Sequence, residues 1–127
     1  MSQLKHYLKD AKNALSDGDY DEAIECSKSA LNLDKNCYFA LVFLGKAYSC
    51  VKELGKSKQN YLKAIEIDQE NVLAWKGLFM LFKNTNDITS FTSFDEYFDL
   101  CGRYAEILTS QQLPMVDLVN DIREFRR

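Results

Sequence analysis

The sequence predicts an all-α protein, a short right-handed α-solenoid built from stacked helical hairpins. Two observations predict it. Residues 38–71 hold two helical patterns joined by a turn, and their order of large and small residues recurs about 34 residues earlier and later. Two short helices cannot bury their apolar faces alone, so each hairpin must stack on the next. An ordinary helical bundle is the alternative interpretation, but a bundle has no reason to repeat its register.

The recurring positions alternate between small residues and large rings. In the central unit they are Leu44, Gly45, Tyr48, Tyr61, Ala64 and Ile67. One unit earlier they are Ala11, Tyr20, Ala23, Ala30 and Leu33, and one unit later Trp75, Leu78 and Phe82. This spacing matches W-x2-L-G-x2-Y followed by alanine, so the chain resembles the tetratricopeptide repeat family. We expect Gly45 to let paired helices approach closely and Tyr61 to fill the gap between stacked units.

Residues 4–37 form the predicted first repeat. Its first helix ends at a turn where Gly18 supplies the backbone freedom that a helix exit needs. Asp19 is the expected N-cap of the second helix, and Glu22 follows three residues later as in a capping box. The apolar periodicity then continues to about Leu33, which completes a helical hairpin.

Residues 38–71 form the second repeat, the unit closest to the family pattern. It departs from that pattern at Ser57, where alanine is usual, but serine is small enough to pack in the same place. The proline that closes the family's repeat is absent from both units, where Lys35 and Gln69 stand instead. The turn signal is weaker for this reason, while the helical signal is unchanged.

Residues 72–109 form an atypical third repeat. Phe79 stands where a small residue is usual, which predicts that the two helices of this unit lie further apart. A polar loop over 84–92 replaces the tight turn, and Ser93 with Glu96 forms a capping box that opens the second helix.

A last helix is expected over residues 114–126, with Pro114 in its first turn. It either caps the third repeat or begins a fourth. The sequence ends inside a helical pattern without a capping glycine. We therefore expect residues 1–127 to be a single domain at the N-terminus of a longer chain.

Composition narrows the function classes. The net charge of −3 argues against a dedicated nucleic-acid surface, and no apolar run approaches the ~18 residues of a membrane span. The N-terminus lacks the apolar centre of a secretory signal. The cysteines, which show no C-x-x-C pair, indicate a reducing compartment, either the cytosol or the nucleus.

Catalysis finds little support in the residues. The single histidine, His6, has no catalytic constellation around it, and neither a G-x-G-x-x-G nor a G-x-x-x-x-G-K-[ST] phosphate loop is present. The cysteine spacings do not suit a metal site. We predict a protein that is not an enzyme and uses no cofactor or metal.

The lysines fall at recurring positions of the repeat. In this family the first helix of each pair lines a groove, and its groove positions here hold Lys5, Lys9, Lys12, Lys46, Lys76 and Lys83, with Phe43 and Met80 beside them. The acidic residues fall mostly on second helices. The predicted function is a basic groove for an acidic or carboxylate-bearing peptide. The alternative, equally weighted, is that lysine only solubilises an exposed face.

One specific groove function is disfavoured. Chaperone-binding members of the family clamp a C-terminal carboxylate with lysine, arginine and asparagine. The matching places hold Leu8, Lys12, Phe43, Leu73 and Gly77. Only Lys12 could contribute, so a heat-shock co-chaperone is not expected.

A closer resemblance covers nearly the whole chain, including the atypical third repeat. The stretches YFALVFLGKAYS (38–49), LAWKGLFMLFKNT (73–85) and SFDEYFDLCGRYAEIL (93–108), with LKDAKNALSDGDYDEAIE near the start and VDLVNDIREFRR at the end, are similar to the tetratricopeptide scaffold subunits of fungal superkiller complexes. The resemblance implies a cytoplasmic scaffold with a DExH RNA helicase and WD-repeat subunits. Such assemblies deliver mRNA to the exosome in general turnover, nonsense-mediated decay, non-stop decay and antiviral defence.

Three hypotheses follow from different classes. The favoured one is a protein-interaction scaffold in which the N-terminal arm contacts the exosome or its adaptor, supported by an aromatic face of Phe91, Phe94, Tyr97 and Tyr104. The second is a generic peptide-binding adaptor or co-chaperone that uses the lysine groove. The third is direct RNA contact, which we expect to fail because the groove lacks arginine and stacking aromatics.

Overall fold

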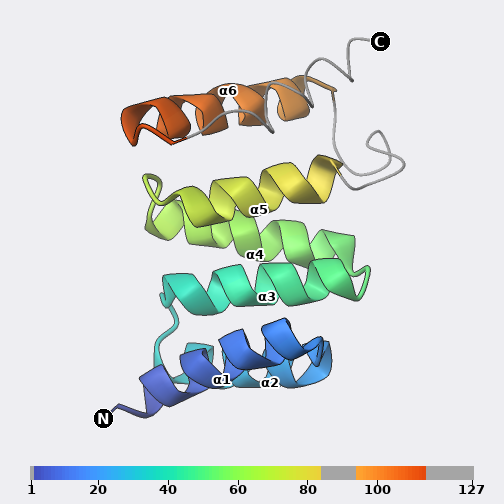
Figure 1. Ribbon diagram of the computed structural model, residues 1–127, viewed down its shortest axis with the longest axis vertical. Helices are drawn as coiled ribbons and strands as arrows, with labels where there is room; N and C mark the ends of the chain where they lie inside the picture. The colour runs from blue at the N-terminus through green and yellow to red at the C-terminus, as the bar shows by residue number, and fades with distance from the viewer. Residues whose placement is uncertain (1, 84–93, 114–127) are drawn as a thin grey trace.

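The computed structural model describes residues 2–83 and 94–113, and within them the chain forms α-helices and no strand (Figure 1). The helices are α1 (Gln3–Asp17), α2 (Tyr20–Leu33), α3 (Tyr38–Cys50), α4 (Leu54–Ile67), α5 (Val72–Lys83) and α6 (Phe94–Ser110). The all-α prediction is therefore confirmed. The predicted loop over 84–92 and the predicted helix over 114–126 lie outside the described residues.

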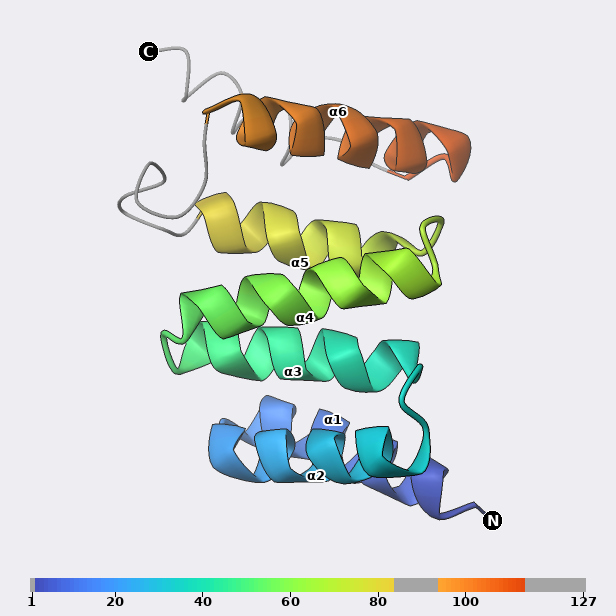
Figure 2. The ribbon, with the colours of Figure 1, turned by 180° about the vertical axis from the view of Figure 1, so that it is seen from behind.

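The helices form hairpins that stack along the long axis of the molecule (Figures 1 and 2). α2 packs on α3 and α4 packs on α5, which joins each hairpin to the next. α1 also contacts α3, and α3 contacts α5, so the first helices of the three pairs lie side by side. α1 lies in front of α2 in Figure 1 and behind it in Figure 2. The first helices thus form one layer of the stack.

Helix ends follow the residues that the sequence marks as caps. Gly18 ends α1 in the left-handed conformation, with φ of +78°. The Asp19 carboxylate accepts a hydrogen bond from the Glu22 backbone N–H at 3.3 Å and caps α2, as predicted. One repeat later the same left-handed position is occupied by Lys52, with φ of +68°. A side chain with a Cβ costs roughly 1–2 kcal/mol in that conformation.

The ring of Tyr61, on α4, lies between the first helices α3 and α5. A Cβ built at Gly45 on α3 would come within 2.8 Å of the ring's Cε1 and Cζ, and a Cβ built at Gly77 on α5 would overlap the same two atoms. Glycine at both positions lets the two backbones close on the ring from either side. Tyr61 is consequently buried and joins three helices, as expected of a ring that fills the gap between repeats.

A tyrosine hydroxyl also links the second repeat to the third. Tyr38 Oη accepts a hydrogen bond from the backbone N–H of Ala74 at 2.9 Å and donates one to the carbonyl of Asn71 at 3.3 Å. Asn71 Oδ1 accepts from the N–H of Leu73 at 3.1 Å. The first turn of α5, whose N–H groups have no partner inside the helix, is therefore satisfied in part by the preceding repeat.

Aromatic rings occupy the interface of the third pair. Phe79 of α5 is only 1% exposed, and its ring centroid lies 5.3 Å from that of Tyr104 on α6. The first two hairpins have Ala11 and Gly45 at the position of Phe79. The third hairpin therefore closes over two rings where the others close over a small residue, as the atypical sequence of this repeat indicates.

Two buried serines lie in different hydrogen-bonding environments. Ser57 Oγ donates to the carbonyl of Gly45 at 2.6 Å, so it fills the usual alanine position and adds a bond between α3 and α4. Ser27 Oγ is equally buried but has no hydrogen-bond partner among the described residues. A buried hydroxyl without a partner loses its hydration without compensation.

We predict that Gly77→Ala lowers the free energy of unfolding by about 1–3 kcal/mol, because the added methyl group overlaps the buried Tyr61 ring. Gly102→Ala is the matched control: a Cβ there meets no atom within 4 Å, and replacing a helical glycine gains roughly 0.5–1 kcal/mol. Urea denaturation followed by circular dichroism measures both. Equal stability of the two variants would contradict a steric conflict between a Cβ at position 77 and the Tyr61 ring.

The same substitution at the two serines should have opposite effects. Ser27→Ala is expected to raise the free energy of unfolding by about 1 kcal/mol, since it removes an unpaired buried hydroxyl. Ser57→Ala is expected to lower it by roughly 0.5–1.5 kcal/mol through loss of the bond to Gly45. Thermal unfolding of both variants beside the unmodified chain tests this, and a destabilised Ser27→Ala variant would show that its hydroxyl is satisfied in solution.

Candidate protein-binding face

The first helices α3 and α5 each leave one narrow stripe uncovered. On α3 the stripe runs through Phe39, Phe43, Lys46 and Cys50, all exposed except the half-buried Phe43. On α5 it runs through exposed Leu73, Lys76 and Met80 and half-buried Gly77 and Lys83. Residues three or four apart lie above one another on a helix. Most other residues of both helices are buried against their neighbours, and Tyr48, Ser49 and Val72 are half-buried.

α1 presents the equivalent stripe one repeat earlier. It consists of Lys5, Lys9, Lys12 and Ser16, which are all exposed. Because α1 contacts α3 and α3 contacts α5, the three stripes lie next to one another. We call the surface that they form the first-helix face.

The first-helix face is basic at one end and apolar at the other. Its α1 part carries three lysines, whereas α3 and α5 expose Phe39 (44%), Leu73 (42%) and Met80 (36%). The lysines predicted from the sequence to line a groove lie on this face, all exposed except the half-buried Lys83, and their role in binding a partner stays a prediction. Phe39 and Leu73 were not among the residues predicted for this surface, although they occupy the position of Lys5 one and two repeats later.

The expectation that the groove lacks stacking aromatics has to be set against one exposed ring on α3. Phe39 is exposed, and its ring centroid lies 6.4 Å from that of Phe43. The expectation that it lacks arginine is correct for α1, α3 and α5, whose sequences contain none. RNA contact therefore has to be tested directly.

Carboxylates are kept off the first-helix face. α3 and α5 contain no aspartate or glutamate. The carboxylates of α1 belong to Asp10 and Asp17, which fall on the neighbouring stripe of that helix with Asn13. α1 thus separates lysines and aspartates onto two adjacent stripes.

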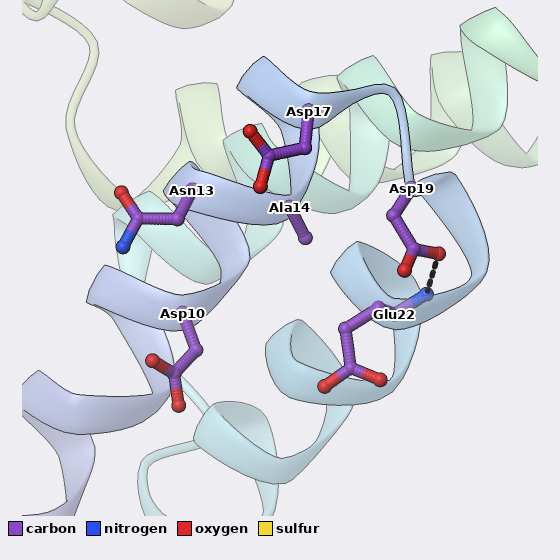
Figure 3. Close-up of a pocket in the computed structure, with 6 residues that line it drawn as sticks. All are labelled: Asp10, Asn13, Ala14, Asp17, Asp19 and Glu22. Atoms are coloured by element: carbon purple, nitrogen blue, oxygen red, sulfur yellow. Dashed lines mark hydrogen bonds between the residues drawn. The ribbon is translucent and has the colours of Figure 1, made fainter.

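The acidic stripe of α1 opens into a pocket of about 260 Å³ between α1 and α2 (Figure 3). Its lining is formed by Asp10, Asn13, Ala14, Asp17, Asp19 and Glu22. The Asp19 side chain is engaged in capping α2. No group of three or more histidine, cysteine or carboxylate side chains in the described part of the chain is placed to hold a metal ion.

A second pocket, of about 270 Å³, lies where α4, α5 and α6 meet. Its apolar lining comes from Leu62, Trp75, Leu78, Phe82 and Leu100, and Glu96, Asp99 and Arg103 complete it. Lys58 Nζ bridges to Glu96 Oε1 at 2.7 Å and Arg103 to Asp99 at 3.5 Å, so its charged groups are paired within the chain.

The predicted aromatic face is not assembled by the described residues. Tyr104 is 7% exposed and packs in the core against Phe79, so it is not a surface contact. Phe91 lies outside the described residues. Phe94 and Tyr97 belong to α6, but their side chains lie outside the description.

The nucleophilic side chains suit a structural role. Cys26, Cys37 and Cys101 are buried, and Cys50 is exposed. Burial raises the pKa of the Cys101 thiol to about 11. Burial, together with the nearby carboxylate of Glu22, raises the pKa of Cys26 to about 11. A raised pKa reduces the thiolate fraction on which nucleophilic attack depends. His6 lies exposed on α1.

The sequence pattern described as the tetratricopeptide repeat matches residues 11–37 and 40–71. The chain belongs to the tetratricopeptide repeat family. The matched segments are the first two hairpins, which pair α1 with α2 and α3 with α4. Within the described residues, no helix is both long and apolar enough to cross a membrane.

Individual relatives extend the similarity beyond the two matched repeats. "Superkiller protein 3" of Saccharomyces cerevisiae is 43% identical over 136 residues, covering 100% of this chain and 10% of that protein. The Schizosaccharomyces pombe protein of the same name is 53% identical over 85 residues, 67% of this chain and 6% of that protein. The human "Superkiller complex protein 3" is 33% identical over 106 residues, 84% of this chain and 6% of that protein.

The repeats and these relatives together identify a protein-interaction scaffold. The chain spans only a small fraction of the length of the relatives it matches. The described residues present the first-helix face as a solvent-facing surface with a defined order of charged and apolar side chains.

The raised thiol pKa values predict a pH dependence of stability. An unfolded cysteine titrates near pH ~8.5, so above that pH the unfolded chain loses protons that the folded thiols retain. We expect the free energy of unfolding to fall as pH rises from 8 to 9.5, and to fall less steeply in Cys101→Ala. Denaturant unfolding across this range measures it, and an equal slope in the unmodified chain and in Cys101→Ala would contradict the prediction.

Proposed function

We propose that this chain is a protein-binding arm of a superkiller-type scaffold, which couples an RNA helicase to the cytoplasmic exosome for 3′-to-5′ mRNA decay. Its partners in this proposal are proteins: the DExH helicase, a WD-repeat subunit, and the exosome or its adaptor. The helicase hydrolyses ATP, and the arm holds partners in place. The arm acts in the cytoplasm and meets RNA only through the proteins that it binds.

The observation that carries the proposal is the extent of the similarity to the yeast relative. The general repeat pattern matches nothing beyond residue 71, whereas the alignment with the yeast Superkiller protein 3 covers the whole chain. The atypical third hairpin, with Phe79 packed on Tyr104, falls in the part that this alignment covers and the repeat pattern does not. This supports membership of the same kind of assembly more strongly than a repeat match alone would.

The structure offers a surface for this role. The first-helix face presents Lys5, Lys9 and Lys12 beside the exposed apolar side chains of α3 and α5. Exposed apolar groups flanked by charge are typical of protein contacts. Phe91, Phe94 and Tyr97 remain proposed contacts.

A chaperone adaptor is disfavoured by the same surface. A carboxylate clamp needs cationic and amide donors in matching places of the first helices. Leu73 stands exposed at one of these places and Gly77 at another. Neither can donate a side-chain hydrogen bond to a carboxylate.

The test is affinity purification of the tagged chain from yeast cytoplasmic extract, followed by mass spectrometry. We expect recovery of the decay helicase, exosome subunits or their adaptor, at levels unchanged by nuclease treatment, because the contacts are between proteins. In a second experiment, the aligned segment of the yeast relative is replaced with this chain, and the composition of the purified complex is measured.

Two controls make the result decisive. A bait with its helices unfolded by Tyr61→Asp should recover none of these proteins. Deletion of the aligned segment from the yeast relative should remove from the complex the same subunits that replacement of the segment with this chain restores. Recovery of heat-shock chaperones alone would overturn the proposal, as would recovery that disappears when RNA is digested.

A further inference from the structure

The pocket of about 270 Å³ where α4, α5 and α6 meet lies away from the first-helix face. Leu73 of that face and Phe82 of the pocket are nine residues apart on α5, about two and a half turns, so they point to opposite sides of the helix. Resting on the proposed function, we propose that this pocket holds one large apolar side chain of a partner protein, while an arginine or lysine of the same partner segment binds at its acidic rim.

Apolar groups form the base of the pocket and part of its walls. Trp75, Leu78 and Phe82 come from α5, which lies between α4 and α6 in the stack (Figure 1). Leu62 of α4 and Leu100 of α6 stand on either side of them. Leu100 is buried, whereas Leu62 is 42% exposed. An exposed leucine beside an apolar base is stabilised when a partner covers it.

The exposed leucine belongs to this junction and not to the repeat in general. Ala30 and Ala64 are equivalent buried residues of α2 and α4, and two residues before them stand Lys28 and Leu62. Lys28 is exposed, so the stack tolerates a charged residue at this place. The fold therefore does not require an apolar side chain at position 62, which is what a contact with another protein would require.

The size of the pocket suits a side chain. Sites for small molecules usually have volumes of about 300–1,000 Å³, and this pocket is smaller than that. Protein contacts commonly depend on one large side chain that enters a well-packed pocket and is fully desolvated there. The expected occupant is thus a single leucine, methionine or phenylalanine side chain of a partner.

The charged rim favours a cation beside that side chain. α6 contains four carboxylates and one arginine, and Glu96, Asp99 and Arg103 of this helix line the pocket. Lys58 Nζ lies 2.7 Å from Glu96 Oε1 and 5.8 Å from the centroid of the Phe82 ring. Asp99 lies 3.5 Å from Arg103, with both side chains more than half exposed. Such an exposed pair contributes at most about 1 kcal/mol, so a partner's cation can compete for the Asp99 carboxylate.

The other lysines of α4 lie on a different side of that helix. Lys56 Nζ lies 5.5 Å from the centroid of the Tyr48 ring on α3. Lys63 follows Lys56 by seven residues, about two turns, and so shares its side of α4. Glu66, one turn after Leu62, is exposed and adds a carboxylate on the pocket side. Carboxylates at the rim repel phosphate groups, whereas a basic protein segment complements them.

The experiment uses Trp75, the single tryptophan of the chain, as a reporter. Its indole lines the pocket, so a side chain that enters the pocket should change its fluorescence. Twelve-residue peptides without tryptophan are selected from a random display library on the immobilised 127-residue chain, and enriched peptides are titrated while Trp75 emission is recorded. We expect peptides that change the emission to carry a large apolar residue with an arginine or lysine within about four positions, one helical turn.

Matched substitutions locate the binding site of these peptides. Leu62→Lys introduces the residue type of the equivalent position in α2 and should weaken binding at least about tenfold. Leu73→Lys is its control, because Leu73 is also 42% exposed but belongs to the first-helix face; binding should stay within about twofold. Circular dichroism confirms that each variant is folded.

A second pair of substitutions tests the acidic rim. Asp99→Asn should weaken binding about threefold at about 50 mM salt and less at about 300 mM, because salt screens exposed charges. Glu106→Gln is the control, since Glu106 is exposed on α6 and does not line the pocket.

Several results would overturn the inference. They are the absence of any enriched peptide that changes Trp75 emission, enrichment of such peptides without a basic residue, and binding that Leu62→Lys leaves unchanged. Dimerisation in sedimentation that Leu62→Lys abolishes would assign the pocket to a second copy of the chain. Much tighter peptide binding by a chain ending at residue 113 would assign it to residues 114–127. Displacement of the peptide by a twelve-nucleotide oligouridine would assign it to RNA.

Affinity purification separates this inference from the proposed function. The tagged Leu62→Lys chain should lose at least one of the decay proteins that the tagged Leu73→Lys chain recovers. Equal recovery by the two baits would refute the inference and leave the scaffold function standing. Failure of the unmodified chain to recover any of these proteins would refute the function itself.

Discussion

The position of the Tyr61 ring between α3 and α5 controls how the other parts of the chain are arranged. Gly45 and Gly77 admit the ring from two sides, and the backbones of adjacent first helices can then approach each other across it. Because these helices lie side by side, their uncovered stripes merge into one surface. A packing requirement in the core, in which Gly77 of the face takes part, therefore helps to decide which side chains face the solvent.

Burial and exposure divide the apolar residues of α3 and α5 into two sets. Leu41, Leu44, Trp75 and Leu78 close the core, while Phe39, Leu73 and Met80 remain in solvent on the opposite side of the same helices. Exposed apolar side chains are ordinary when scattered, but these lie at neighbouring positions of adjacent repeats. Lys5, at the equivalent position of α1, shows that the fold tolerates a charged residue there. The apolar choice on α3 and α5 is thus not required by the stack.

The sequence was sufficient for the helices, since apolar spacing and capping residues such as Asp19 are local properties. It was not sufficient to predict the left-handed backbone conformation of Lys52, because a lysine carries no local preference for that conformation. Only part of the first-helix face could be predicted from the sequence. A lysine is recognised in the sequence by its charge. The sequence alone does not distinguish a buried residue such as Tyr104 from an exposed one such as Leu73. Which apolar side chain is covered depends on neighbours brought by tertiary packing, here the Phe79 ring.

The contact between Tyr61 and Gly77 also bears on how such an array can change over evolution. One repeat before Tyr61 and Gly77, the chain has Ser27 and Phe43, so the large and the small residue have exchanged helices. A duplicated second repeat would bring its own Phe43 to the position of Gly77, directly against Tyr61. Growth of the array by copying this unit alone would therefore create a steric conflict at the new junction. Paired substitutions on both sides of the junction would have to accompany the duplication, which makes each junction specific to its two neighbours.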